Sequence, residues 1–439
     1  MNTAITDMLA AYTINTTAED IPDSARRIAQ LSLIDWLAVS VAGREEPVGQ
    51  IVRNMIEDEG GAEQASVFGS KRKFPVRAAA LANGTISHAL DYDDTHFIHI
   101  GHPSVGIIPA ALAIAQQTHS NRNEWLDAAL IGMEVSCRVG DWLGRSHYKH
   151  GFHQTATAGS IGATVAAARL LKLNIEQTRY AIGLAATRAS GLKCQFGTMG
   201  KPYHAGMAAA NGVEAAKLAA SGFISRPDAL ECEQGLAWTH HADCNTTAFD
   251  KLGEDYVFES VQHKLHACCH GTHAALEALI EARTQHKINP DNIARVELRV
   301  HSPWLKVCNI PAPETGLEAK FSYRLTTAMA LYSHDTAAIS AFNDAMCRLP
   351  ELVALRDRVD VIADDTMQET QATVTITTHQ GDTISTYHDL AAPMNYEQRA
   401  QKVKAKAATL LGQELMEKFW IIVAGENKDL TVLETLMQG

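Results

Sequence analysis

Apolar residues recur at the three- and four-residue spacing of amphipathic helices through about the first 265 residues of the chain. One such series begins after Ser24, a residue type that caps helices, and stops at Gly43. The same spacing predicts helices over residues 109–117, 125–139, 155–171, 176–189 and 204–220. The segments 155–171 and 204–220 are rich in alanine and glycine. Because small side chains let helices approach closely, we expect these two helices near the centre of a helical core.

The pattern changes after Lys264. Residues 293–301 and 372–378 alternate apolar and polar side chains, which predicts half-buried strands, and residues 379–382 predict a turn into a further strand over 383–387. Helical spacing over 272–282, 326–331 and 337–346 separates these strands and returns from Tyr396 to the end. We therefore expect a small antiparallel sheet with helices beside it.

Together these patterns predict a mainly α fold with an α+β second domain. The large, all-helical domain comes from both ends of the chain, residues 1–264 and 396–439, and the smaller α+β domain comprises residues 265–395. Neither internal repeats nor low-complexity tracts interrupt the sequence.

Composition narrows the possible partners. The chain has 439 residues, 46% hydrophobic and 20% charged, with a formal net charge of -12. That charge argues against nucleic acid or anionic membranes as partners. The N-terminus lacks the pattern of a signal peptide, and no uninterrupted apolar run is long enough to span a bilayer. The eight cysteines form no metal-binding or disulfide pattern, so we expect a soluble, cytoplasmic protein with reduced thiols.

The densest polar segment is NGTISHALDYDDTHFIHIGH, residues 83–102, which holds three aspartates and four histidines. Histidine exchanges protons near neutral pH, and carboxylates can orient imidazoles, so the segment is a candidate for acid–base chemistry. A zinc or iron site is the rival interpretation, although the segment contains neither H-x-x-x-H nor H-E-x-x-H. In the simplest alternative it is a polar loop in which Asp94 or Ser104 caps the next helix.

Three further segments carry candidate residues. His153 in GFHQT precedes an Ala/Gly-rich helix, whose N-terminus would suit a carboxylate, and Lys201 in GTMGKPYHAG stands at another helix start. The segment KLHACCHGTH begins with Lys264 at the proposed domain junction and includes Cys269 and His273. The sequence lacks G-x-G-x-x-G, Walker and G-x-S-x-G motifs, which argues against nucleotide cofactors and serine hydrolysis.

These segments, taken in order, resemble the MmgE/PrpD family, which includes 2-methylcitrate dehydratases, cis-aconitate decarboxylases and iminodisuccinate epimerases. The resemblance covers nearly the whole chain. It is carried by ALANGTISHALDYDDTH with the following HPS, GFHQTATAGSIGA, GTMGKPYHAGMAAANGVEAAKLAASGF, KLHACCHGTHAALEAL and EAKFS. It implies a helical domain with a smaller α+β lid, a homodimer, and catalysis without a metal or organic cofactor.

The resemblance also assigns site residues. It implies catalytic roles for Asp91, His102, His153, Lys201 and Lys264. It implies substrate contacts for Thr95, Tyr203, His204, Cys269 and His273.

The sequence departs from the family pattern at two positions. Leu325 stands where decarboxylase- and dehydratase-like members carry a tyrosine three residues after the serine of EAKFS, and Gly200 stands where many relatives have threonine. The run SYRLTTAMAL is more similar to the epimerase branch.

The resulting hypothesis is a lyase of the dehydratase type that acts on a small di- or tricarboxylate by proton transfer at carbon. The lysines would neutralise substrate carboxylates, and His102, oriented by Asp91, would exchange the proton. The alternatives are a dicarboxylate epimerase, a cis-aconitate decarboxylase, a non-catalytic dimeric family member and a metalloenzyme that uses Asp91, Asp93 and the neighbouring histidines.

Overall fold

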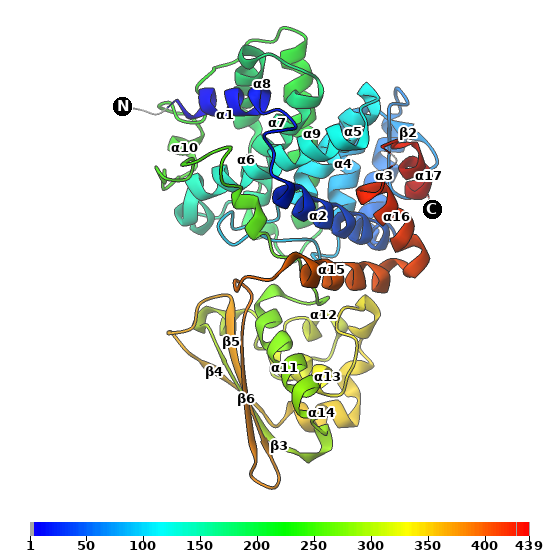
Figure 1. Cartoon of the computed structure of the whole chain (residues 1–439), viewed down its shortest axis with the longest axis vertical. Helices are drawn as coiled ribbons and strands as arrows, with labels where there is room; N and C mark the ends of the chain where they lie inside the picture. The colour runs from blue at the N-terminus through cyan, green and yellow to red at the C-terminus, as the bar shows by residue number, and fades with distance from the viewer. Residues whose placement is uncertain (1–3, 427, 439) are drawn as a thin grey trace. The chain divides into compact units, whose positions relative to one another are not determined.

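A computed structural model describes residues 4–426 and 428–438 (Figure 1). The chain divides into a helical unit, Met1–His263 with Leu411–Gly439, and a mixed unit, Lys264–Leu410. The expected fold class, mainly helical with an α+β part, is confirmed. Within the described residues, no helix is both long enough and apolar enough to cross a membrane.

Helices account for most of the helical unit. The longer ones are α1 (Ile5–Asn15), α2 (Asp23–Gly43), α3 (Pro47–Glu59), α4 (Val76–Ser87), α5 (Ser104–Thr118), α6 (Arg122–Lys149), α7 (Gln154–Leu170), α8 (Ile175–Arg188), α9 (Gly200–Ala220), α16 (Gln413–Ala424) and α17 (Thr431–Gln438). The short α10 (Leu236–Thr239) and a two-stranded ladder of β1 (Ala65–Ser66) and β2 (Lys73–Phe74) complete the unit. That ladder corrects the expectation of an all-helical domain.

Helices α4, α5, α7 and α9 pack together as the Ala/Gly content predicts. The closest approach joins α4 and α9 at Gly84 and Gly206. A Cβ atom on Gly206 would lie 2.2 Å from Oγ1 of Thr85 and 2.4 Å from the carbonyl oxygen of Leu81. Only glycine fits there, and the crossing brings the C-terminal end of α4 near the N-terminal end of α9.

Several helix starts differ from the expectation. Helix α5 begins at Ser104 rather than near residue 109, because the Asp94 carboxylate accepts the Ser104 backbone N–H (3.3 Å) and its hydroxyl. Helix α9 begins at Gly200 rather than at residue 204. The expected cap at Ser24 is wrong: α2 starts at Asp23, and the Ser24 hydroxyl donates to Glu259.

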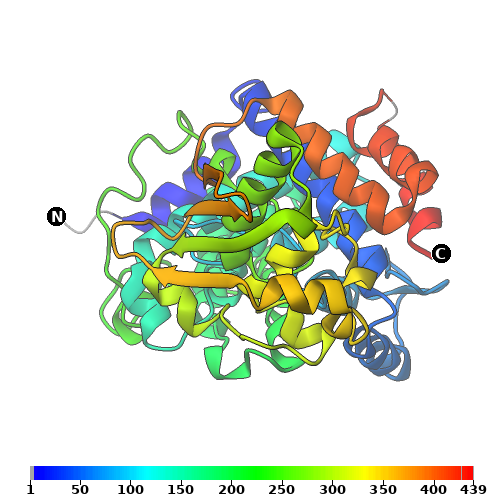
Figure 2. The same cartoon turned by 90° about the horizontal axis from the view of Figure 1, so that it is seen from below.

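The mixed unit holds a four-stranded sheet in the order β4-β3-β5-β6. Figure 2 shows β3 between β4 and β5. The strands are β3 (Ile293–Val300), β4 (Val359–Ala363), β5 (Gln371–Thr378) and β6 (Thr383–Asp389). The expected alternation and the turn between β5 and β6 are present. The sheet is mixed rather than antiparallel, because the long connection after β3 returns β4 parallel to it.

Helix α11 packs on β5 and β6, and α13 contacts β4. The helices of this unit are α11 (His273–His286), α12 (Gly316–Ala319), α13 (Tyr323–Leu331), α14 (Pro350–Arg356) and α15 (Tyr396–Leu411). The helix expected over 337–346 is wrong, since only short 3-10 turns form there. Asp335 and Asn343 accept the backbone N–H groups of Ala337 and Met346, and such local side-chain bonds compete with a helix.

Candidate active site

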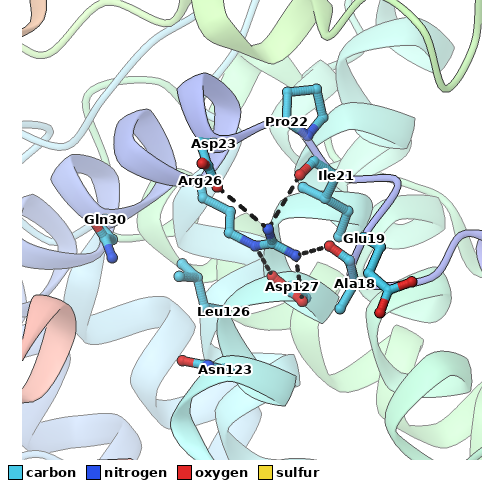
Figure 3. Close-up of a pocket in the computed structure, with 10 residues that line it drawn as sticks. All are labelled: Ala18, Glu19, Ile21, Pro22, Asp23, Arg26, Gln30, Asn123, Leu126 and Asp127. Atoms are coloured by element: carbon cyan, nitrogen blue, oxygen red, sulfur yellow. Dashed lines mark hydrogen bonds and ion pairs between the residues drawn. The ribbon is translucent and has the colours of Figure 1, made fainter. Parts of the chain in front are cut away.

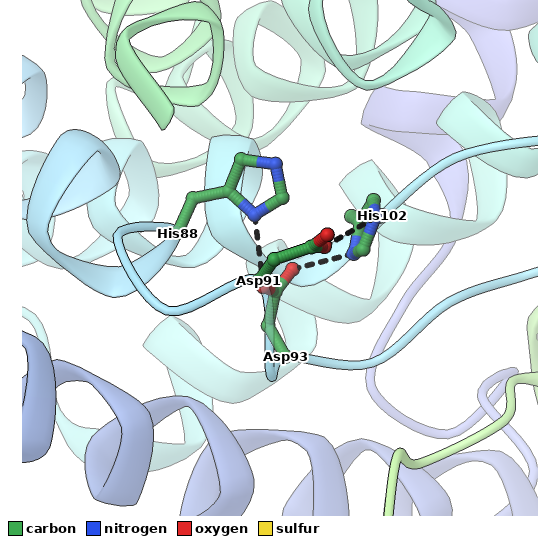
Figure 4. Close-up of side chains that lie close together, drawn as sticks. All are labelled: His88, Asp91, Asp93 and His102. Carbon is green, nitrogen blue, oxygen red and sulfur yellow. Dashed lines mark hydrogen bonds and ion pairs between the residues drawn. The ribbon is translucent and has the colours of Figure 1, made fainter. Parts of the chain in front are cut away.

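The polar segment between α4 and α5 folds into a cluster of two aspartates and two histidines (Figure 4). His88 follows α4 directly, and His102 precedes α5 by two residues. Both oxygens of Asp93 are engaged: Oδ1 lies 2.8 Å from Nδ1 of His88, and Oδ2 lies 2.8 Å from Nδ1 of His102. The buried Asp93 carboxylate therefore hydrogen-bonds His88 and lies at ion-pair distance from His102, without the geometry of a hydrogen bond.

Asp91 links the cluster to α9. Its Oδ2 lies 2.7 Å from Nζ of Lys201, and its Oδ1 lies 3.4 Å from Nε2 of His102. Asp91 adopts φ 50°, a left-handed conformation uncommon for residues other than glycine. Its side chain is 45% exposed, in contrast to the buried Asp93, so this carboxylate is the solvent-facing member of the cluster.

His153 extends the cluster from α7. Its ring centroid lies 6.1 Å from that of His88 and 6.5 Å from that of His102, and its Nδ1 lies 3.0 Å from Nδ1 of His204. Phe196 meets the His153 ring edge-on at 4.9 Å, and its ring centroid is 5.3 Å from Nζ of Lys201. The Phe196 ring thus borders both the Lys201 ammonium and the His153 imidazole.

Three helix N-termini carry these residues. His102 lies just before α5, His153 is the N-cap of α7, and Lys201 and His204 stand in the first turn of α9. The helices are 15, 17 and 21 residues long, so aligned peptide dipoles leave a partial positive charge at each N-terminus. Asp94 already accepts the first N–H of α5, and Thr198 accepts those of Gly200 and Lys201 in α9. With Lys201, these ends make a local environment that favours anions in a protein whose net charge is negative.

Burial sets the protonation of the histidines. It lowers the pKa of His102 to about 4, although the Asp93 carboxylate acts in the opposite direction. It also holds the pKa of His153 well below its usual range, with help from the Lys201 charge. For Asp93, burial acts to raise the pKa, but the His102 and His88 imidazoles outweigh it and keep the pKa low. At neutral pH His102 is therefore a neutral base beside an ionised carboxylate.

Asp94 has a supporting role beneath the cluster. Burial raises its pKa to about 7, against the hydrogen bonds from Ser104 and Ser32. The Ser32 hydroxyl also lies 3.1 Å from Nε2 of His263. Asp94 therefore holds the start of α5 and connects the polar loop to α2, which agrees with the interpretation of this residue as a cap.

The remaining predicted residues of the helical unit lie at the edge of the cluster. The backbone of Thr95 exchanges hydrogen bonds of 2.8 and 2.7 Å with Gln262, which pairs the polar loop with the chain just before Lys264. His204 is buried, whereas Tyr203 is 41% exposed. The structure thus brings Asp91, His102, His153, Lys201 and His204 together.

Lys264, Cys269 and His273 belong to the mixed unit. Lys264 is buried. Burial lowers the pKa of His273 well below its usual range, and the Lys264 charge adds to this shift. Burial raises the pKa of Cys268 to about 12, and the Lys264 charge opposes that shift. Cys269 hydrogen-bonds the Cys308 thiol. These three predicted residues therefore lie in one neighbourhood of that unit.

The residues predicted for proton transfer and substrate binding did not include His88 or Asp93; Asp93 and the neighbouring histidines entered only the metalloenzyme alternative. The polar density of residues 83–102 was the signal that pointed to both. Phe196 had no signal, because nothing in the sequence places it against His153.

The four residues of the cluster also suit a metal ion. One potential ligand atom from each of His88, Asp91, Asp93 and His102 lies within 4.8 Å of the others, and this donor set fits zinc or iron. The contacts that these carboxylates already make favour proton transfer among the side chains over binding of a metal ion. Asp93 already meets two imidazole nitrogens, and the Lys201 ammonium occupies one oxygen of Asp91.

A separate pocket of about 730 Å³ lies between the start of α2 and α6 (Figure 3). Its arginine, Arg26, contacts Asp127 at 2.8 and 3.1 Å and donates to the carbonyl oxygens of Ile21 and Ala18. The Arg26 guanidinium is already paired, and no predicted site residue lines this pocket. The pocket is therefore a weaker candidate for an active site than the His/Asp cluster.

Comparison with known proteins shows the family of the chain. The MmgE/PrpD N-terminal domain matches residues 7–244, and the MmgE/PrpD C-terminal domain matches residues 266–427. The cis-aconitate decarboxylase of Homo sapiens is 24% identical over 99% of this chain and 95% of its own length. A cis-aconitate decarboxylase-like protein, oryM, of Aspergillus oryzae is 29% identical over 66% of this chain and 63% of its own length. The cis-aconitate decarboxylase of Aspergillus terreus is 26% identical over the same shares.

Proposed function

Because the chain belongs to the MmgE/PrpD family, we propose that it is a cofactor-independent lyase of the dehydratase type acting on a small di- or tricarboxylate. The observation that carries the proposal is the placement of Asp91 between the Lys201 ammonium and the His102 imidazole. Lys201 is a cation and His102 a neutral base, and both contact the Asp91 carboxylate. A substrate carboxylate could bind to Lys201 in the same way and would then lie next to the base.

The chemistry explains why both groups are needed. Removing a proton from a carbon next to a carboxylate places negative charge beside an existing charge. Lys201 and the helix N-termini of α5, α7 and α9 neutralise the substrate carboxylates, and this lowers the cost of the carbanion-like state. Lys264 is the second proposed carboxylate ligand, a role that rests on its motif.

His102 is the proposed proton-transfer group. Its Nδ1 is held by Asp93, so Nε2 is the nitrogen directed toward Asp91 and the substrate position. Nε2 takes the proton from carbon, the C–O bond on the neighbouring carbon breaks, and the hydroxyl leaves as water after receiving a proton. His153 is the proposed donor of that proton: its ring is neutral in the free protein, takes up one extra proton from solvent when the anionic substrate binds, and returns to the neutral form when it protonates the hydroxyl. Thr95 contributes a hydrogen bond.

A second candidate, epimerisation of a dicarboxylate, has a specific observation in its favour. The Leu325 side chain is fully buried and offers no hydroxyl, and the nearby Tyr323 hydroxyl donates to the Gly271 carbonyl at 2.7 Å. The mixed unit therefore lacks a free tyrosine hydroxyl at this position. An epimerase needs only removal and return of the carbon-bound proton. Decarboxylation of cis-aconitate, the activity named for the relatives, is the third possible outcome.

One experiment separates these reactions. The purified protein is incubated in deuterated water with 2-methylcitrate, citrate, cis-aconitate, malate and iminodisuccinate, and proton NMR is recorded. Dehydration gives an alkene product, epimerisation gives deuterium in recovered substrate without loss of water or carbon dioxide, and decarboxylation shortens the carbon skeleton. Tight binding without turnover of any acid would contradict an enzymatic role and favour a binding protein.

The His102→Ala variant tests whether the activity depends on the His/Asp cluster. We expect turnover to fall by about two to four orders of magnitude, the range typical of losing a general base. The exposed His286 on α11 provides the control, and His286→Ala retains wild-type turnover. Equal turnover in the two variants would exclude His102 as the proton-transfer group.

A further inference from the structure

Two imidazoles face each other through the same ring nitrogen. Nδ1 of His153 lies 3.0 Å from Nδ1 of His204, and the two side chains are 2% and 4% exposed. His153 is the residue just before α7, and His204 is the fifth residue of α9. The contact joins two of the helices that build the site.

A contact between two Nδ1 atoms constrains both tautomers. One ring must carry a proton on Nδ1 and donate it, and the other must accept through an unprotonated Nδ1. When His153 is the donor and both rings are neutral, its Nε2 has a free lone pair and can act as a base. When His204 is the donor, Nε2 of a neutral His153 carries a proton and can act as an acid.

The surroundings of the pair oppose a second positive charge. Lys201 lies on the same helix turn as His204, His88 ends α4, and His102 precedes α5, so cations or potential cations face His153 from three elements. Asp91 and Asp93 are paired with these groups rather than with the His153–His204 pair. The Phe196 ring, which also contacts His153, carries no charge. The two rings can therefore hold one extra proton between them, but not two.

We infer that His204 is a positioning residue that sets the tautomer of His153, and that the two imidazoles exchange protons with substrate as one unit. When Nε2 of His153 accepts a proton, the Nδ1 proton crosses to His204. The positive charge then rests on His204, and His153 is left neutral with a proton on Nε2, ready to donate. This inference depends on the proposed function in one respect: it assumes that the substrate lies at Nε2 of His153.

Side-chain NMR tests the pair directly. In protein labelled with ¹⁵N-histidine, we expect long-range ¹H–¹⁵N spectra to show opposite tautomers for His153 and His204 at neutral pH. In the His204→Phe variant, which keeps a planar ring without nitrogen, the His153 tautomer changes. Spectra in which both wild-type rings carry their proton on Nε2 would overturn the inference. This measurement needs no substrate, so it stands apart from the test of the proposed function.

Kinetics distinguish positioning from packing. His204→Phe is expected to lower kcat by about 10- to 100-fold with little change in KM, as for loss of an orienting partner, and to move the acid side of the pH profile. His204→Asn restores part of kcat, because its amide can donate or accept near the position of Nδ1. His286→Phe, on an exposed face of α11, is the control and keeps wild-type kinetics. A folded His204→Phe variant with wild-type kcat and pH profile would overturn the inference.

Discussion

The Nζ atom of Lys201 lies 2.7 Å from Oδ2 of Asp91, although 110 residues separate them in the chain. The pair joins the loop after α4 to the first turn of α9, and Asp91 also lies 3.4 Å from His102. In the proposed reaction a substrate carboxylate takes the place beside Lys201 that Asp91 holds in the free protein.

Replacing Lys201 by glutamine removes this cation while retaining a hydrogen-bonding side chain. We expect kcat/KM to fall by about 10²- to 10⁴-fold, because a charge that stabilises the transition state is lost. Steady-state kinetics on the substrate identified by NMR measure the effect. Lys217→Gln, near the opposite end of the same helix, is the matched control. Lys201 would have no role in catalysis if both variants kept wild-type kcat/KM.

Asp93→Asn tests whether one carboxylate orients both His88 and His102. An amide can accept from one Nδ1–H but presents an N–H₂ group to the other ring, so one imidazole is forced into the wrong tautomer. We expect kcat to fall by about 10²- to 10⁴-fold, as when an orienting aspartate is lost from a catalytic histidine. Asp58→Asn on α3, which is exposed, serves as the control. Similar kcat values for the two variants would show that Asp93 is dispensable.

Gly206→Ala tests how the helix crossing positions the site. The added methyl would lie 2.2 Å from Thr85 and 2.4 Å from a backbone carbonyl, so α9 must move away from α4. We expect a loss of about 1–3 kcal/mol in the free energy of unfolding, together with lower kcat. Gly159→Ala on α7 is the contrasting case, because its nearest neighbour is an ordinary 3.6 Å from the added atom. Urea denaturation compares the two, and an unchanged stability of Gly206→Ala would contradict the close-packing account.

Acidification should destabilise the fold. Burial lowers the pKa values of five histidines to about 3 or 4: His96, His99, His102, His147 and His204. Their unfolded pKa is about 6.5, so between about pH 4 and 6.5 the unfolded chain binds more protons. Stability is therefore present above pH 6.5 and is lost as the pH falls. Asp94, with its pKa raised to about 7, and Glu134, whose pKa burial also raises, act in the opposite direction, but they are two groups against five.

Urea denaturation between pH 7 and 5 measures this dependence. Each histidine contributes up to about 1.4 kcal/mol per pH unit where its protonation differs fully between the folded and unfolded states. His96→Gln should reduce the slope, and His286→Gln should leave it unchanged, because His286 is exposed. A stability that is constant or rises on acidification would contradict the buried, neutral state of these histidines.

Chelation tests the proton network against a metal centre. Because Lys201 and the two imidazoles already engage Asp91 and Asp93, we expect turnover to be the same before and after treatment with EDTA. Elemental analysis of the purified protein accompanies the assay. Stoichiometric zinc or iron, with activity lost on its removal and regained on its return, would identify the four-residue cluster as a metal site.

The sequence alone determined the class of fold and the identity of the polar segments, because both depend on local patterns. Helical spacing, strand alternation and the turn after β5 are set by neighbouring residues, and the density of histidine and aspartate in residues 83–102 is visible without coordinates. It did not determine the parallel pairing of β4 with β3, which depends on how a long connection returns to the sheet.

Tertiary structure decided which polar residues meet. Close packing at Gly84 and Gly206 brings Lys201 to Asp91, and the start of α7 brings His153 to His204. Burial, which no local pattern specifies, separates the roles of two neighbouring aspartates: Asp93 is kept ionised by two imidazoles, whereas Asp94 has a pKa raised to about 7. The sequence gives the residue types. The distances between their side chains, and the polarity of their surroundings, are set only when helices far apart in the chain pack together.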